Sequence, residues 1–210
     1  MAISTLTVLI LVVLFVFVAF RAFVPTSLTS ELRRSFESAV IHLPELPEHV
    51  PLAFSTAIDP DFYVTPRLTS PITKYLVTLY ARQEAPDRRM SPTGQIALGS
   101  AFAAEFSHDE LMLWLVSKAY LGLGCFGVAN ASQAHFATPI QDIDLSRIAL
   151  LTALSKATTH LNLERAPDLV LAERNAILKG METMGAMGPD VIVQAISMPL
   201  QVQSPLPKCD

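Results

Sequence analysis

The stretch YLGLGCFGVANASQAH, residues 120–135, decides how the rest of the chain is interpreted. Gly122, Gly124 and Gly127 have the G-x-G-x-x-G spacing of a dinucleotide-binding loop, which requires a strand before the first glycine. The preceding segment SHDELMLWLVSKAY instead has the pattern of a helix. Because glycine also permits positive φ and close backbone approach, the stretch predicts a tight connection between helices. A dinucleotide is therefore not expected as a ligand.

The segments around this connection carry helix start and stop signals. Ser107 and Glu110 have the spacing of a capping box, Asp144 precedes the apolar run LSRIALLTALSKA, and Gly185 ends the run APDLVLAERNAILKGMETMG. Further helices are predicted at residues 72–83 and 94–106. Alternating β-branched runs are scarce, so the sequence predicts an all-α fold.

The N-terminus predicts a membrane anchor. Residues 3–24 are mostly apolar with a single charge at Arg21, and about 20 such residues span a hydrocarbon core of roughly 30 Å. The first residues MAIST lack Lys and Arg, and no A-x-A site follows, which favours an uncleaved anchor over a signal peptide. The expected division is an anchor at 1–25, a juxtamembrane helix and proline-rich neck at 26–50, a main domain at 51–200 and a tail at 201–210.

Composition narrows the classes of ligand. The formal charge is −4 and no Lys/Arg run occurs, which argues against nucleic-acid binding. The five histidines show no metal-binding spacing, so no metal site is predicted. The spacing of Cys125 and Cys209 predicts neither a disulfide framework nor a zinc site. Cys125 is expected to be a small buried hydrophobic residue rather than a nucleophile.

From Ser107 onward the chain resembles the second half of a peptidoglycan glycosyltransferase domain. This is glycosyltransferase family 51, found in class A penicillin-binding proteins and monofunctional transglycosylases. Its pattern is S-K-x-E-I-L-E-x-Y-L-N, G-x-G-x-Y-G, A-A-x-x-Y-F and x-K-P, followed by a helix rich in E-A-A-L-L-A and then P-K-A-P. The residues that match in register are Ser107, Asp109, Glu110, Leu111, Tyr120, Gly122, Gly124, Phe126, Gly127, Ala131, Gln133, Phe136, Pro139, Leu145, Ala149, Leu150, Leu151, Ala153, Lys156 and Ala157.

The resemblance extends to both ends of the main domain. AERNAILKGMETMG resembles the family's closing R-x-x-V-L-x-x-M-x-x-x-G. Towards the N-terminus, AFSTAIDPDFY resembles A-x-x-A-x-E-D-x-x-F-Y, and TSPITKYLV resembles S-T-I-T-Q-Q-L-x-K. The resemblance implies a lysozyme-like all-α transglycosylase domain behind one N-terminal transmembrane helix.

The same resemblance implies a location and a reaction. Arg21, Arg33 and Arg34 all lie on the C-terminal side, and the positive-inside rule would place the main domain in the cytoplasm. The family implies the opposite orientation at the cytoplasmic (inner) membrane, because its members polymerise lipid II outside that membrane. One glutamate acts as general base, and a second assists departure of the pyrophosphate together with basic residues. The family also admits a divalent cation, and no other cofactor is expected.

This chain departs from the family at the residues that carry the chemistry. Phe62 and Asp59 align with the phenylalanine and aspartate of E-D-x-x-F, which puts Ile58 at the base position, although a one-residue slip would put Asp59 there. The second glutamate aligns with Gln95. By resemblance, the candidate catalytic positions are Asp59 and Gln95, and the candidate substrate-binding residues are Ser70, Thr73, Lys74 and Lys118.

Glycines and apolar positions are kept while acids, amides and phosphate-binding bases are replaced. We therefore expect a catalytically impaired protein that binds lipid-linked cell-wall precursor or a cell-wall synthesis partner. Two alternatives stay open: an active glycosyltransferase that uses Asp59 and Glu105, and a structural scaffold of an envelope complex. If Asp59 and Gln95 form a catalytic pair, they should face each other across a groove.

Overall fold

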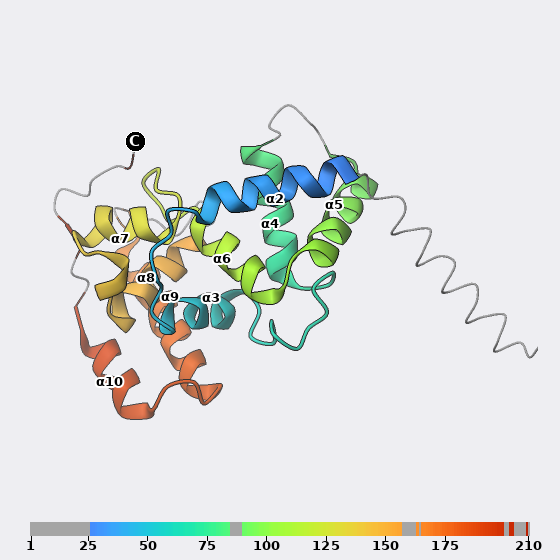
Figure 1. Ribbon diagram of the computed structural model, residues 1–210. Helices are drawn as coiled ribbons and strands as arrows, with labels where there is room; N and C mark the ends of the chain where they lie inside the picture. Colours follow the sequence, from blue (N-terminus) through green and yellow to red (C-terminus); the bar gives the residue numbers. More distant parts are fainter. Residues whose placement is uncertain are drawn as a thin grey trace, which may run out of the picture.

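The computed structural model describes residues 26–84, 90–156, 163, 165–199, 202–203 and 209. Its helices are α2 (Thr26–Val40), α3 (His49–Ile58), α4 (Pro71–Gln83), α5 (Pro92–Glu105), α6 (His108–Lys118), α7 (Val128–Phe136), the 3-10 turn η1 (Ile140–Asp142), α8 (Leu145–Ser155), α9 (Pro167–Thr183) and α10 (Pro189–Ser197) (Figure 1). An isolated bridge pairs Tyr120 with Phe126, and these residues form no strand. The predicted all-α fold is confirmed.

The predicted anchor lies outside the described residues. Across the ranges given above, no helix combines the length and the apolar character that a membrane crossing requires. The anchor at residues 1–25 therefore stays a prediction.

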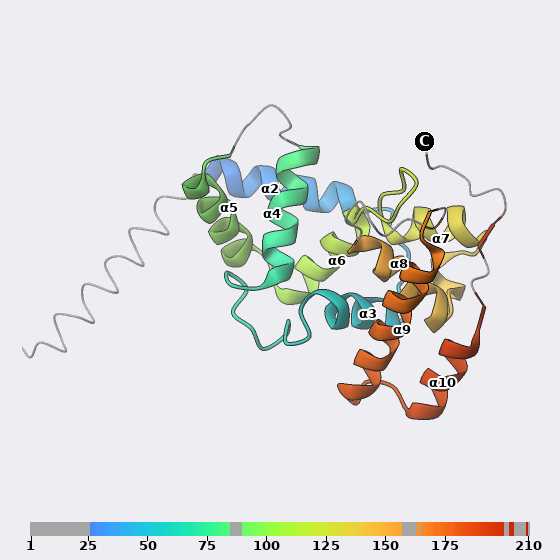
Figure 2. The same ribbon diagram turned by 180° about the vertical axis from the view of Figure 1, so that it is seen from behind.

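The helices form two lobes that lie side by side (Figures 1 and 2). The first lobe contains α2, α4, α5 and α6, and the second contains α3, α7, α8, α9 and α10 with η1. Contacts of α3 with α4 and α6, and of α6 with α7, join the lobes. The chain thus enters the second lobe at α3, returns to the first at α4, and crosses again after α6.

Aromatic rings from four helices meet in the core of the first lobe. Trp114 of α6 is 3% exposed, and its ring centroid lies 4.8 Å from that of Phe102, 5.8 Å from Phe36 and 6.3 Å from Tyr80. These partners belong to α5, α2 and α4 respectively. Burying several aromatic rings is a large apolar contribution, and tilted ring pairs add about 0.5–1.5 kcal/mol each. Trp114 is thus a core residue that holds the four helices together.

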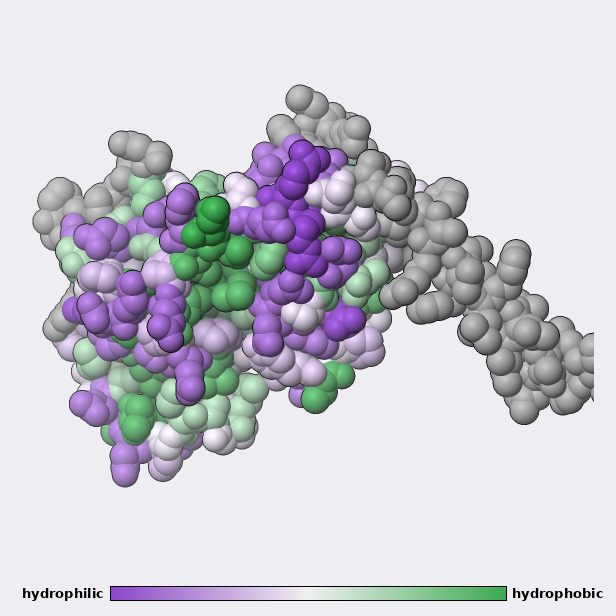
Figure 3. Space-filling view, viewed as in Figure 1, coloured by the Kyte–Doolittle hydropathy of each residue, from purple (hydrophilic) through white to green (hydrophobic). Residues whose placement is uncertain are grey.

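Helix α2 packs into this lobe although it lies within the segment predicted as a juxtamembrane helix and neck. Its inner side buries Leu32 and Phe36, while hydrophilic side chains gather over its outer side (Figure 3). Arg33 pairs with Glu105 at 3.0 Å and with Glu110. Its guanidinium also lies 4.4 Å from the ring centroid of Phe106. Amphipathic packing and these ion pairs fix α2 against α5 and α6.

The predicted capping box at the start of α6 is present. The Ser107 hydroxyl accepts a hydrogen bond from the Glu110 backbone N–H, and the Glu110 carboxylate accepts one from the Ser107 N–H at 2.8 Å. Burial alone would raise the pKa of Glu110, but hydrogen bonds from Ser107 and Arg33 outweigh it and lower that pKa below its usual value. The cap thereby also anchors the ion pair with α2.

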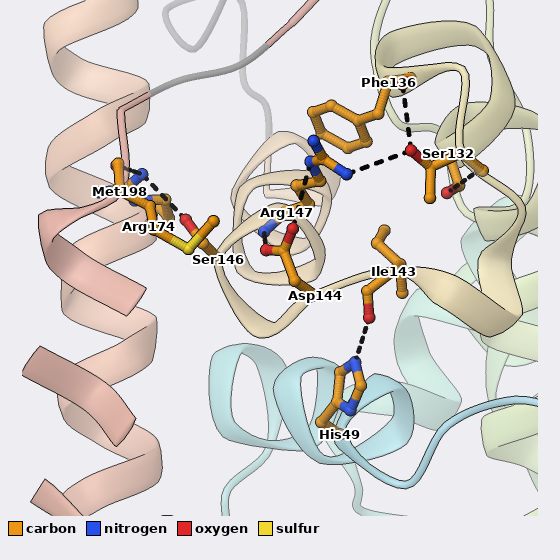
Figure 4. A network of polar contacts seen from close by, with 10 residues as sticks. His49, Ser132, Phe136, Ile143, Asp144, Ser146, Arg147, Arg174 and Met198 are labelled. Atoms are coloured by element: carbon orange, nitrogen blue, oxygen red, sulfur yellow. Dashed lines mark hydrogen bonds and ion pairs between the residues drawn. The ribbon is translucent and has the colours of Figure 1, made fainter. Parts of the chain in front are cut away.

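Helix α8 is the centre of the second lobe, because nearly every side chain from Ser146 to Ser155 is buried. Arg174 of α9 is also buried, and it donates hydrogen bonds to the Met198 carbonyl and to the Ser146 hydroxyl (Figure 4). It also donates one to the Ile196 carbonyl. It therefore satisfies carbonyls at the end of α10 that the helix cannot satisfy itself. One side chain joins α8, α9 and α10.

The start of α8 confirms a second predicted cap. The Asp144 carboxylate accepts a hydrogen bond from the Arg147 backbone N–H at 2.9 Å. The preceding carbonyl, of Ile143, is 2.8 Å from His49 Nε2 of α3 (Figure 4). Helix α3 is thus fixed against the turn that begins α8.

The glycine-rich stretch forms the predicted tight connection between α6 and α7. Gly127 has φ +81°, and its N–H donates to the Ala119 carbonyl at 2.8 Å. A Cβ at Gly127 would lie 2.5 Å from the carbonyl oxygen of Ser117. A side chain at this position is therefore excluded both by backbone conformation and by the end of α6.

The prediction for the cysteines is wrong in one respect. Cys125 is buried, as expected, but it forms a disulfide with Cys209, 84 residues away in the sequence. The pair forms because the chain end returns to the glycine-rich connection. Spacing in the sequence carries no signal of that return.

The close approach at Gly127 can be tested by Gly127→Ala. We expect this variant to lose about 3–4 kcal/mol of unfolding free energy, because positive φ costs alanine about 1–2 kcal/mol and the Ser117 carbonyl must also move. Gly185→Ala is the matched control, since Gly185 has φ +69° and no atom within 4 Å of the added Cβ. Urea denaturation measures both, and equal losses would contradict the close approach.

The buried His135 should make stability depend on pH. Burial lowers its pKa from the usual value, although the Leu121 carbonyl, 2.9 Å from Nε2, acts in the opposite direction. A lowered folded-state pKa means that the unfolded chain binds more protons, so stability is full above the unfolded pKa of 6.5 and falls below it.

We therefore expect the unfolding free energy to rise between pH 5 and pH 7 by up to about 1.4 kcal/mol per pH unit. His135→Gln should flatten this rise, whereas His42→Gln, at an exposed position, should leave it unchanged. Equal slopes in the three proteins, measured by denaturation at each pH, would show that His135 does not titrate in this way.

Candidate functional site

A groove opens between the two lobes. Its volume is about 420 Å³, within the range of small-molecule sites. Its walls are the end of α3, one face of α4, Tyr120 in the connection after α6, and the end of α8. The lining residues are Ala57, Ile58, Tyr75, Thr78, Leu79, Arg82, Tyr120, Ser155 and Lys156.

One face of α4 supplies much of the lining. Tyr75, Leu79 and Arg82 are spaced by four and three residues, so they lie on one side of the helix. The Tyr75 hydroxyl donates to the Ser155 carbonyl at 3.3 Å, which joins α4 to α8 across the floor of the groove. Burial raises the pKa of Tyr75, and the positive charge of Arg82 partly opposes this. Tyr75 is therefore a neutral hydroxyl at neutral pH.

The charged groups of the groove are cationic. Lys156 forms an ion pair with Glu173 of α9, and Arg82 is exposed with no ion-pair partner among the described residues. None of the described lining residues is an aspartate or a glutamate. An apolar groove with a guanidinium and an ammonium at its edge suits an anion that carries an apolar part, because Arg binds phosphate and carboxylate in a forked geometry.

Two consecutive residues at the end of α3 point to different places. Ile58 lines the groove, whereas Asp59 is 5% exposed and accepts a hydrogen bond from the Ser70 hydroxyl at 2.6 Å. The Asp59 carbonyl also accepts from the Phe62 N–H, which closes the turn after α3. The aligned base position is thus apolar, and the neighbouring carboxylate is directed to the start of α4.

The structure does not bring Asp59 and Gln95 together. Asp59 is bonded at the N-terminus of α4, and Arg67 just before that helix donates to the Ala103 carbonyl near the end of α5. Helices α4 and α5 are therefore antiparallel. Gln95 precedes Ala103 by eight residues, about 12 Å along α5, and its side chain is exposed and outside the groove.

The other candidate residues surround α4 rather than the groove. Ser70 is the buried cap of α4, and Thr73 is buried with no described partner for its hydroxyl. Lys74 is exposed on the first turn of the same helix. Lys118 pairs with Glu84 at 3.1 Å, at the opposite end of α4. None of these four lines the groove, and Glu105 is paired with Arg33.

A divalent cation does not fit the groove. Hard cations require carboxylate or carbonyl oxygens, and the described lining offers two cationic side chains and no carboxylate. In the described ranges, no group of three or more His, Cys, Asp or Glu side chains is arranged to hold a metal.

Sequence reasoning missed the residues that do line the groove. Tyr75, Arg82, Tyr120 and Lys156 come from three separate segments, which only the folded chain brings together. The helical spacing of Tyr75, Leu79 and Arg82 was a usable signal. It puts a hydroxyl and a guanidinium beside a leucine on one face of α4, which is the kind of surface that lines a binding site.

Comparison with known proteins identifies the family. Residues 68–182, more than half of the chain, match the family described as Transglycosylase. The chain belongs to the transglycosylase family. This is the peptidoglycan glycosyltransferase domain, family 51, that the motifs around Gly122 and Gly127 indicated.

The similar proteins are much longer than this transglycosylase-like chain. It is 34% identical over 98 residues to penicillin-binding protein 1A of Aquifex aeolicus, covering 47% of this chain and 14% of that protein. It is 24% identical over 173 residues to penicillin-binding protein 1A of Mycobacterium tuberculosis, covering 71% and 21%. A crystal structure of penicillin-binding protein 1A from Haemophilus influenzae is 19% identical with a TM-score of 0.48, covering 77% and 17%.

The Asp59–Ser70 hydrogen bond can be tested by Ser70→Ala. We expect a loss of about 2–4 kcal/mol in unfolding free energy, because the variant removes a helix cap and leaves a buried carboxylate without this donor. Ser91→Ala is the matched control: Ser91 also caps a helix, but its hydroxyl is exposed. That variant should lose about 1 kcal/mol, and equal losses in denaturant titrations would show that the bond to Asp59 contributes nothing.

Proposed function

We propose that the protein is a membrane-anchored, peptidoglycan glycosyltransferase-like protein that binds lipid-linked cell-wall precursor and polymerises it poorly or not at all. One observation carries the proposal. The groove has cations beside an apolar wall, and the motif alignment puts Ile58 of that wall at the position of the family's base.

The chemistry of the groove supports binding of such a precursor. Lipid II joins a pyrophosphate to an apolar chain and a sugar, which matches a groove with cations beside apolar side chains. Arg82 has no competing carboxylate among the described residues, so its donors are available to a phosphate. Tyr75, Tyr120 and Ser155 add neutral polar groups beside it.

The same groove argues against efficient catalysis. A general base must lie within hydrogen-bond reach of the hydroxyl it deprotonates, and its loss typically lowers the rate by about 10²–10⁴-fold. Ile58 cannot accept a proton. Asp59 is bonded to Ser70 inside the protein, and Glu105 is bonded to Arg33, so neither is directed into the groove.

The disulfide supports an extracytoplasmic location. Disulfides persist in oxidising compartments and are rare in the cytosol. A Cys125–Cys209 bond is therefore easier to reconcile with a main domain outside the cytoplasmic membrane than with the cytoplasmic orientation that the arginines favour. Membership of the transglycosylase family points to the same side.

A binding measurement with purified lipid II tests the proposal. We expect the full-length protein in detergent to bind fluorescent lipid II, and Arg82→Gln to weaken binding about 10-fold or more, because charge-assisted hydrogen bonds contribute about 1.5–3 kcal/mol. Arg34→Gln removes the same charge from an exposed position on α2 and should bind like the wild type. Absence of any binding would favour the scaffold alternative, and equal effects of the two variants would place binding elsewhere.

The same preparation is then assayed for glycan polymerisation beside a family enzyme with both glutamates. We expect no polymer from the wild type under conditions in which that enzyme is active. Polymer formation at a comparable rate would overturn the proposed impairment and leave the active-enzyme alternative standing.

A further inference from the structure

The described parts of the chain end lie against the glycine-rich connection. Cys209 is bonded to Cys125 through the disulfide, and its N–H donates to the Leu123 carbonyl at 3.1 Å. Further back, the Gln203 N–H donates to the His135 carbonyl at 2.8 Å. The chain end is therefore held at two places, one covalent and one by hydrogen bonding to the end of α7.

The connection is shaped to accept this chain end. Gly124 has φ +81°, and a Cβ there would lie 2.8 Å from the carbonyl oxygen of Cys209. Gly122 has nearly the same φ, +84°, but its added Cβ would meet only the Leu154 side chain at an ordinary 3.7 Å. Of these two glycines, Gly124 alone is required by the approach of Cys209.

The disulfide is also directly linked to the wall of the groove. The Leu121 N–H donates to the Cys125 carbonyl at 2.8 Å, and Tyr120 forms a bridge with Phe126, with ring centroids 5.2 Å apart. These two contacts hold Tyr120 and the disulfide-bonded Cys125 in one small loop. Of the residues in this loop, Tyr120 lines the groove.

We propose that the Cys125–Cys209 disulfide is a covalent clasp that fixes the glycine-rich loop and thereby holds Tyr120 in the wall of the groove. The two thiols lose two protons and two electrons as the sulfur–sulfur bond forms. A small-molecule or protein disulfide accepts the electrons and protons by thiol–disulfide exchange and becomes two thiols. The reverse exchange with a reducing dithiol releases the chain end and loosens the loop. This clasp does not depend on which ligand the groove binds.

The redox state and the loop are measured on the full-length protein. We expect protein isolated from membranes with thiols blocked at lysis to carry no alkylated cysteine, and dithiothreitol to expose two. Reduction, or Cys209→Ala, should increase amide exchange at residues 119–127 about 10-fold or more and leave the exchange of α9 unchanged. Free thiols in the isolated protein, or unchanged exchange in the loop after reduction, would overturn the clasp.

The two neighbouring glycines provide the matched control. Gly122→Ala and Gly124→Ala impose similar backbone strain, but only the second obstructs Cys209. After reduction, re-formation of the disulfide with oxidised glutathione should be at least about 10-fold slower in Gly124→Ala than in Gly122→Ala. Equal rates of disulfide re-formation in the two variants would contradict the proposed position of Cys209 against Gly124. If Gly124→Ala does not fold, the exchange measurement on Cys209→Ala decides the question.

Discussion

The hydrogen bond from the Ser70 hydroxyl to the Asp59 carboxylate is the contact on which the groove depends. Asp59 ends α3 in the second lobe, and Ser70 begins α4 in the first. Eleven residues apart in the chain, they join the end of α3 to the start of α4, and both helices contribute residues to the lining of the groove. Because the bond is buried and one partner is a carboxylate, losing the Ser70 hydroxyl leaves that carboxylate without this donor away from water. A residue that does not line the groove therefore contributes to the geometry of the site.

The stability of the fold does not depend on an acid in the groove. It comes from buried rings around Trp114, from the buried apolar side chains of α8 and from Arg174 at the end of α10, and none of these side chains lines the groove. A base in the groove, by contrast, would be a carboxylate partly removed from water, which destabilises the folded state unless it is paired. On the proposed motif alignment, Ile58 stands in place of such a base and this cost is absent. The proposed function is thus a groove that binds without proton-transfer chemistry.

Local features could be predicted from the sequence, and features assembled from distant segments could not. Ser107 with Glu110, and Asp144, cap helices as predicted because a cap is read from neighbouring residues. Helix α3 was not predicted, although its Pro51 lies in the first turn, where a proline lacks only an N–H that has no helical partner. The groove and the disulfide were missed because their residues lie far apart in the chain. Asp59 and Gln95 were paired by motif alignment, which does not show where their side chains point in the folded chain.

The glycines that first suggested a nucleotide loop have a backbone role in this protein. Gly127 lets the chain pass against the Ser117 carbonyl at the end of α6, and Gly124 lets the chain end lie on the loop. At each glycine, a methyl group would collide with a neighbouring backbone carbonyl. The glycines therefore allow two segments of this chain to approach closely, rather than a phosphate to approach the backbone. Between them, Cys125 adds a covalent tie at the point of closest approach. The same stretch that identifies the family therefore also joins the chain end to a wall of its groove.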